Sequence, residues 1–98
     1  MQFYSTNNKD LRVSFQEAVF NSLPQDKGLY MPESIPQLDP YFIKNIQQYS
    51  FQEIAFQIAN AIIGKDIPAD DLKKIINEAI NFDAPLVFLN SETAVLEL

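Results

Sequence analysis

The stretch from Lys27 to Pro36 most restricts how this chain can fold, because glycine and proline fix its backbone. Gly28 is one of only two glycines, and the polar residues before it favour a tight turn with a positive φ at Gly28. The apolar run Leu29–Met31 has strand character, and Pro32 stops it because proline offers no N–H to a continuing ladder. Pro36 fixes a second extended step. The stretch therefore predicts a turn, a buried edge strand and a rigid connector.

The residues before this stretch predict a short strand, a turn and a helix. Residues 3–6 form a candidate strand, residues 7–10 a turn, and residues 11–13 a few further extended positions. Ser14 and Glu17 have the spacing of a capping box, so a helix begins there and ends at Pro24. Four residues at helical spacing predict its buried face: Phe15, Ala18, Val19 and Leu23.

A second and a third helix are predicted after the connector. Asp39 is a suitable N-cap, and Pro40 suits the first helical position, where its missing N–H costs nothing. A second capping box at Ser50 and Glu53 requires the first of these helices to break near Tyr49. The apolar stripe of the second helix is Phe42, Ile43, Ile46 and Tyr49. That of the third helix is Phe51, Ile54, Ala55, Ile58, Ala59, Ile62 and Ile63.

The third helix is expected to end at Gly64 as its C′ residue, and a fourth helix follows Pro68. Asp70 and Asp71 fall in the first turn of that helix, where the helix dipole favours negative charge. Its predicted buried face is Leu72, Ile75, Ile76 and Ala79.

In the last part of the chain the residue pattern changes from one typical of helices to one typical of strands. Residues 86–90 and 93–96 are apolar runs separated by Ser91 and Glu92, which predicts a hairpin. The whole pattern indicates an α/β (α+β) fold, a single domain in which about four helices pack on a small sheet of short strands.

Composition limits the classes of partner and location. The formal charge is −6 with no basic cluster, so we expect no nucleic-acid partner. Cysteine is absent, the first ten residues do not resemble a signal peptide, and no apolar run approaches the length of a membrane span. We therefore expect a cytoplasmic protein that neither enters a membrane nor binds a metal.

Several kinds of catalytic site are excluded by missing residues. The chain has no histidine and no cysteine, which rules out a Ser-His-Asp triad, a Cys-His pair and a His/Cys zinc site. Gly28 and Gly64 stand alone, so there is no glycine-rich phosphate loop. Asp70 and Asp71 point about 100° apart on a helix and cannot share a proton as a catalytic pair. We expect no catalytic, cofactor-binding or metal-binding residue.

The lysines and aromatic residues are interpreted as structural. No lysine lies in an apolar run that would lower the pKa of its amine for Schiff-base chemistry: Lys9, Lys27, Lys44, Lys65, Lys73 and Lys74. Most aromatic residues fall on the helical stripes, which indicates core packing. Tyr4 and Tyr30 instead adjoin a turn or a proline and could present their hydroxyls at a docking surface.

The chain resembles the N-terminal domain of threonine synthases, a family of pyridoxal-phosphate enzymes. The resemblance spans the whole chain in a fixed order: Tyr4-Ser5-Thr6, Val13-Ser14-Phe15, Ala18-Val19, Gly28 to Glu33, Ile35-Pro36, Ile67-Pro68, Phe82 to Val87 and Leu96-Glu97-Leu98. Lys27 departs from the family pattern, which often has glycine there.

This resemblance implies a domain over residues 1–98, with cofactor-binding domains following in the same polypeptide. It implies conversion of O-phosphohomoserine and water to threonine and phosphate, with pyridoxal phosphate as the electron sink of the parent enzyme. The family's cofactor lysine lies in a motif that no residue here matches, so these 98 residues alone are expected to be inactive.

Two functions remain open from the sequence. In the first, the chain is the N-terminal part of an enzyme, and partner domains cover the apolar residues 86–89 and 95–98. The candidate interdomain face is Tyr4, Gly28, Leu29, Tyr30, Met31 and Pro32. In the second, the chain is a stand-alone protein-interaction module that shares this domain.

Overall fold

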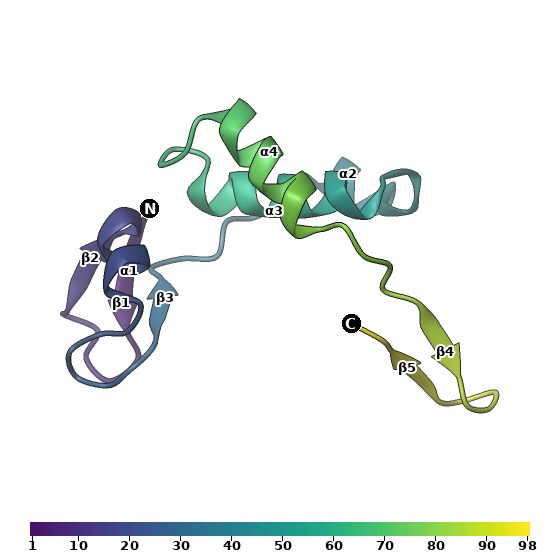
Figure 1. Ribbon diagram of the computed structural model, residues 1–98, viewed down its shortest axis with the longest axis horizontal. Helices are drawn as coiled ribbons and strands as arrows, with labels where there is room; N and C mark the ends of the chain where they lie inside the picture. The colour runs from purple at the N-terminus through teal and green to yellow at the C-terminus, as the bar shows by residue number, and fades with distance from the viewer.

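The computed structural model describes all residues, 1–98, and arranges them in three parts (Figure 1). A small sheet with one helix comes first, a group of helices follows, and a separate hairpin ends the chain. The molecule measures 45 × 32 × 27 Å, and its radius of gyration is 16.4 Å. A compact domain of this length has a radius of about 13 Å, so the three parts are spread out. None of the helices has the length and apolar character needed to cross a membrane.

The N-terminal sheet has three antiparallel strands in the order β2-β1-β3. They are β1 (Gln2–Ser5), β2 (Arg12–Ser14) and β3 (Tyr30–Pro32). The two strands predicted before the first helix are confirmed to within one residue. β3 is the predicted edge strand but is not buried as predicted: Met31 is exposed, because a helix covers only the other face of the sheet. Pro32 is the last residue of β3 and lies opposite Phe3 in a non-hydrogen-bonded pair, so its missing N–H faces the open edge of the sheet. The ladder is not stopped by Pro32 as predicted, because the backbone N–H of Glu33 still donates to the carbonyl of Gln2.

Helix α1 (Phe15–Asn21) covers one face of this sheet, with the ring centroids of Phe3 and Phe15 5.8 Å apart. Its capping box is present as predicted, because Ser14 and Glu17 exchange hydrogen bonds at the first turn. The predicted buried face is only partly correct. Val19 is 57% exposed and Leu23 is also exposed, because the three short strands are too small to cover the whole apolar stripe.

The helical part contains α2 (Pro40–Lys44), the 3-10 helix η1 (Ile46–Gln48), α3 (Phe51–Ile63) and α4 (Ala69–Ala79). Asp39 caps α2 by accepting a hydrogen bond from the backbone N–H of Tyr41. The predicted second helix is interrupted at Asn45, whose side-chain amide donates to the carbonyl of Tyr41. The second capping box, at Ser50 and Glu53, is confirmed. Both acidic residues of the first turn of α4 are also where they were predicted.

The end of α3 differs from the prediction. Gly64 is the C-cap with φ −65° and ψ −15°, so it stays right-handed and does not form the left-handed C′ turn. The chain reaches α4 through a turn in which the backbone N–H groups of Asp66 and Ile67 both donate to the carbonyl of Ile63. A glycine is therefore not required here for a positive φ.

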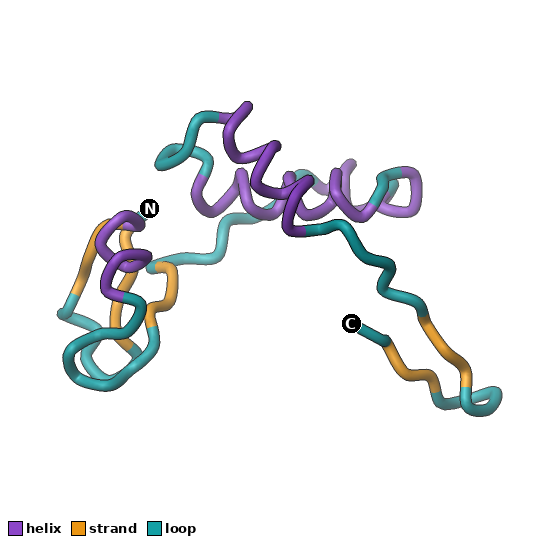
Figure 2. Tube along the Cα trace, viewed as in Figure 1, coloured by secondary structure: helices purple, strands orange, loops and turns teal.

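The core of the helical part includes the contact between α3 and α4, which cross closely (Figure 2). Leu72 of α4 is 1% exposed and Phe42 of α2 is 6% exposed, and the ring of Phe42 lies 5.0 Å from that of Tyr49. Ile75, predicted to be buried, is 50% exposed, because α4 has a neighbouring helix on one side only. The predicted stripe of α4 is therefore correct at Leu72, half-buried at Ile76, and wrong at Ile75 and Ala79, which are both exposed.

The predicted C-terminal hairpin is confirmed as β4 (Leu86–Phe88) and β5 (Ala94–Leu96). It projects from the helical part at the end of an extended linker (Figure 1). The α/β class is also confirmed. The structure adds that α1 is the helix packed closely on the sheet, whereas α3 and α4 pack mainly on each other.

Candidate functional site

Asp26 fixes the turn that leads into β3. Its Oδ1 atom accepts a hydrogen bond from the Ser5 hydroxyl at 2.6 Å and from the backbone N–H of Gly28 at 3.0 Å. Ser5 is completely buried, and its Oγ atom also accepts from the backbone N–H of Asn7. The other oxygen of Asp26, Oδ2, is buried without a hydrogen-bond partner. This network holds the start of β3 against the end of β1.

Neither Asp26 nor Ser5 was predicted from the sequence to have a role of its own. A signal for Asp26 was present, because an Asp two residues before a glycine commonly forms a turn in which its side chain accepts from that backbone N–H. Ser5 gave no comparable signal. Its position depends on strand pairing, which brings it opposite Tyr30.

The predicted positive φ at Gly28 is wrong. Lys27 carries it, with φ 64°, and no glycine has a positive φ. Gly28 is needed for space, since a Cβ atom there would lie 2.3 Å from Ser5 Oγ and 3.0 Å from Asn7 N. The lysine thus occupies the strained position of the turn, and the glycine permits close contact with β1.

The six residues of the predicted interdomain face do not share one surface. Tyr4 and Met31 are cross-strand partners, so their side chains lie on the sheet face opposite α1. Leu29, two residues before Met31, is exposed. The side chains of Tyr30 and Pro32 point to the opposite face, which α1 covers, because successive residues of a strand face opposite sides. Gly28 is buried in the turn. Tyr4, Leu29 and Met31 are thus the members that a partner could contact on this face.

Exposed apolar side chains occur on all three parts of the molecule. Ile35 of the connector is 86% exposed, Phe20 of α1 is 79% exposed, and every residue of β4 and β5 is exposed. Isolated exposed apolar residues are ordinary, but contiguous groups of this extent mark interaction surfaces. The exposure of residues 86–89 and 95–98 agrees with the prediction that they form an uncovered apolar remainder.

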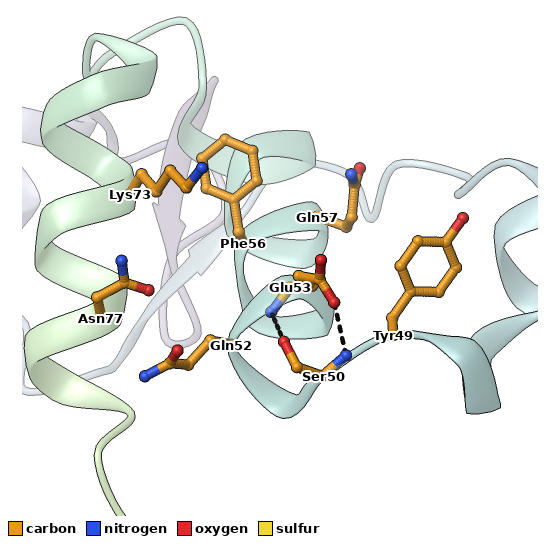
Figure 3. A pocket seen from close by; sticks show the side chains of 8 residues that line it. All are labelled: Tyr49, Ser50, Gln52, Glu53, Phe56, Gln57, Lys73 and Asn77. Atoms are coloured by element: carbon orange, nitrogen blue, oxygen red, sulfur yellow. Dashed lines mark hydrogen bonds between the residues drawn. The ribbon is translucent and has the colours of Figure 1, made fainter.

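A hollow of about 620 Å³ lies where α3 and α4 face each other (Figure 3). Eight residues line it: Tyr49, Ser50, Gln52, Glu53, Phe56, Gln57, Lys73 and Asn77. The Glu53 carboxylate is held by the capping box, where the Ser50 backbone N–H lowers its pKa, as does the Ser50 hydroxyl. The hollow therefore offers hydrogen-bonding groups but no activated nucleophile.

Groups suited to a metal or to Schiff-base chemistry are not assembled in this chain. No three acidic residues lie close enough together to hold a metal ion. All six lysines are exposed, including Lys73 at the edge of the hollow. None of them therefore lies in the apolar or cationic pocket that activates an amine for Schiff-base formation.

Comparison with known proteins identifies the family. Residues 2–80 match the family described as "Threonine synthase N terminus". The chain belongs to this family. The threonine synthase of Schizosaccharomyces pombe is 36% identical over 104 aligned residues that include 100% of this chain, and that of Escherichia coli is 30% identical over 98 residues.

Solved structures of the threonine synthase family share the fold described above. The crystal structure of threonine synthase from Escherichia coli matches 99% of this chain with a TM-score of 0.87 and 29% identity. The crystal structure of PLP-bound threonine synthase from Brucella melitensis matches 99% of this chain with a TM-score of 0.83 and 30% identity. The chain spans 20% of the yeast relative and 23% of the Escherichia coli relative. These matches favour the N-terminal part of an enzyme over a stand-alone module.

Proposed function

We propose that residues 1–98 are the N-terminal domain of a threonine synthase whose cofactor-binding domains follow in the same polypeptide. The parent enzyme would convert O-phosphohomoserine and water to threonine and phosphate. The supporting observation is the match to the Escherichia coli enzyme, which covers 99% of this chain at a TM-score of 0.87.

Pyridoxal phosphate would supply an electron sink for this reaction, but the residues of this chain do not fit it. A phosphate cradle needs several converging backbone N–H groups, whereas Gly28 is packed against Ser5 and Gly64 continues a right-handed helix. All lysines are exposed. Cofactor binding is therefore assigned to the polypeptide outside these residues, and this chain alone would be inactive.

The role we assign to this chain is to dock on the other domains of the same polypeptide. Tyr4, Leu29 and Met31 would contact the partner, while Gly28, Tyr30 and Pro32 would hold β3 in place for that contact. Nucleic acid is not proposed as a partner, given the net charge of −6 and the lack of a basic cluster. Metals and membranes are not proposed either, since no acidic cluster could hold an ion and no helix could cross a membrane. The cytoplasmic location stays a prediction.

The activity is tested on the complete polypeptide encoded by the gene. We expect the purified protein to carry pyridoxal phosphate and to release inorganic phosphate from O-phosphohomoserine in step with threonine formation. A complete polypeptide that binds the cofactor but forms no threonine would contradict the proposed reaction.

The inactivity of residues 1–98 alone is tested by borohydride reduction in the presence of pyridoxal phosphate. We expect only slow, scattered labelling, because each lysine is exposed and none lies in a pocket that would activate its amine. The complete polypeptide is the positive control, with one lysine labelled beyond this chain. Stoichiometric labelling of one lysine within residues 1–98 would contradict the assignment.

A further inference from the structure

The hollow between α3 and α4 is lined by polar side chains that repeat at one helical turn. Glu53 and Gln57 lie four residues apart on α3, so both project from the same side of that helix. Lys73 and Asn77 have the same spacing on α4. Figure 3 shows both α4 side chains extending toward α3. Two rows of polar groups from different helices therefore face one space of about 620 Å³, a volume typical of small-molecule sites.

Contacts within the chain fix the shape of the hollow. The side-chain amide of Gln52 donates to the carbonyl of Ile80 at 2.7 Å, which ties the start of α3 to the end of α4. The backbone N–H of Ser50 donates to Glu53 Oε2 at 2.7 Å and holds that carboxylate in place (Figure 3). Phe56 is half-buried and gives the hollow an apolar wall. A ligand would therefore meet groups that are already positioned, which lowers the entropy cost of binding.

Two opposite charges face the hollow without pairing with each other. Glu53 and Lys73 form no ion pair, and the ammonium of Lys73 makes no hydrogen bond. The hydrogen bonds from Ser50 lower the pKa of Glu53, and the positive charge of Lys73 adds a smaller lowering, so the carboxylate is ionised at neutral pH. The side-chain amides of Gln57 and Asn77 also have no hydrogen-bond partner in the chain. The hollow thus holds one anion, one cation and two open amides.

This combination of charges favours a zwitterion as ligand. Glu53 would repel a ligand that carries only negative charge, as would the net charge of −6. Lys73 would repel a ligand that carries only positive charge. A free α-amino acid carries an ammonium and a carboxylate at neutral pH, so it can satisfy both groups at once. A polar side chain on that amino acid can also pair with the amides of Gln57 and Asn77.

We propose that the hollow binds a free α-amino acid, whose carboxylate pairs with Lys73 and whose ammonium pairs with Glu53. Gln57 and Asn77 form hydrogen bonds to its polar side chain. The binding requires neither the cofactor nor the proposed reaction. Because both charged groups are exposed, we expect each pair to contribute modestly and the dissociation constant to be on the order of millimolar.

A nuclear magnetic resonance titration with L-threonine tests the site, since this amino acid has a side-chain hydroxyl. In residues 1–98 and in the complete polypeptide, we expect the backbone amide signals of residues 50–57 and 73–77 to shift and to saturate. N-acetyl-L-threonine lacks the ammonium and L-threonine methyl ester lacks the carboxylate, so each should bind about fivefold more weakly. Equal affinity for all three compounds would overturn the zwitterion site, as would shifts that do not saturate.

Two matched pairs of substitutions test the assigned charges. Lys73→Gln should weaken threonine binding about fivefold, whereas Lys74→Gln should not change it, because Lys74 does not line the hollow. Glu53→Gln should weaken binding to a similar extent, and its control is Glu17→Gln, at the same position of the other capping box and away from the hollow. The lysine pair leaves both capping boxes intact, so a difference within it cannot come from a loosened helix. Equal affinities within both pairs would overturn the proposal.

Activity separates this site from the proposed reaction. A complete polypeptide that forms threonine but shows no shifts in residues 50–57 and 73–77 would overturn the site and leave the reaction standing. One that shows the shifts but forms no threonine would contradict the reaction and not the site.

Discussion

Gly28 and Lys27 have different roles in the same turn. Gly28 provides space beside Ser5, and Lys27 accepts the left-handed backbone, which costs an L-residue about 1–2 kcal/mol. The more permissive residue is thus placed where contact is closest, and the turn keeps some strain at Lys27.

Substitutions at these two positions should have opposite effects. Gly28→Ala should lower the free energy of unfolding by about 1–3 kcal/mol, because its Cβ would overlap Ser5 Oγ. Lys27→Gly should raise the free energy of unfolding by about 0.5–1 kcal/mol. Glycine would relieve the backbone strain at this position, and part of that gain would be offset because glycine is more flexible in the unfolded chain. Urea unfolding followed by circular dichroism measures both. A stabilising Gly28→Ala would contradict the close contact.

Asp26 is the second residue on which the turn depends. Asp26→Ala should destabilise the chain by about 2 kcal/mol or more, because it leaves the buried Ser5 hydroxyl and the Gly28 N–H without their acceptor. Asp10→Ala is the control, since Asp10 is exposed and its side chain makes no hydrogen bond; it should change stability by less than about 0.5 kcal/mol. Equal unfolding midpoints for the two variants would show that the network adds nothing.

At the scale of elements, the two capping boxes couple helix stability to pH. The pKa of Glu17 is lowered from its ordinary value of 4.5 by the hydrogen bond from the Ser14 backbone N–H and then by the Ser14 hydroxyl. Ser50 lowers the pKa of Glu53 in the same way. A lowered pKa in the folded state means that the unfolded state binds protons first as the pH falls.

We therefore expect the capping contribution to be complete above about pH 4.5 and to be lost as the pH falls through the lowered pKa values of the folded state. Urea midpoints measured from about pH 7 down to about pH 3 test this. The double variant Glu17→Gln, Glu53→Gln should show a smaller loss across that range. Glu78→Gln, on α4 without a hydrogen bond, should keep the loss seen in the natural chain. Equal slopes for all three proteins would contradict the coupling.

At the scale of the whole molecule, few interactions join the three parts. The N-terminal ammonium of Met1 lies 3.7 Å from Asp66 Oδ2, and this is the one ion pair between the sheet and the helices. A single pair of this kind contributes at most about 1 kcal/mol. The arrangement of the parts is thus weakly held within this chain.

Small-angle scattering of residues 1–98 should therefore give a radius of gyration of about 16 Å or more, close to the 16.4 Å of the structure. Raising the salt concentration should increase it slightly by weakening the Met1–Asp66 pair. A radius near 13 Å, expected for a compact domain of this size, would show that the parts collapse on one another and that the exposed apolar faces are covered internally.

The sequence by itself determined the features that depend on residues close together in the chain. Capping at Ser14 and Ser50, the helix start at Pro40 and the hairpin could be inferred, because hydrogen bonds three residues apart and local periodicity set them. The family was inferred separately, from the resemblance of short motifs in a fixed order. Only the tertiary structure decided which apolar faces are covered, because burial depends on what packs opposite. Strand pairing placed the Met31 side chain next to that of Tyr4, on the sheet face opposite Tyr30. Ile75 is exposed because no second helix packs on that side of α4. The close contact between Gly28 and Ser5, 23 residues apart, and the positive φ at Lys27 were likewise visible only in the tertiary structure.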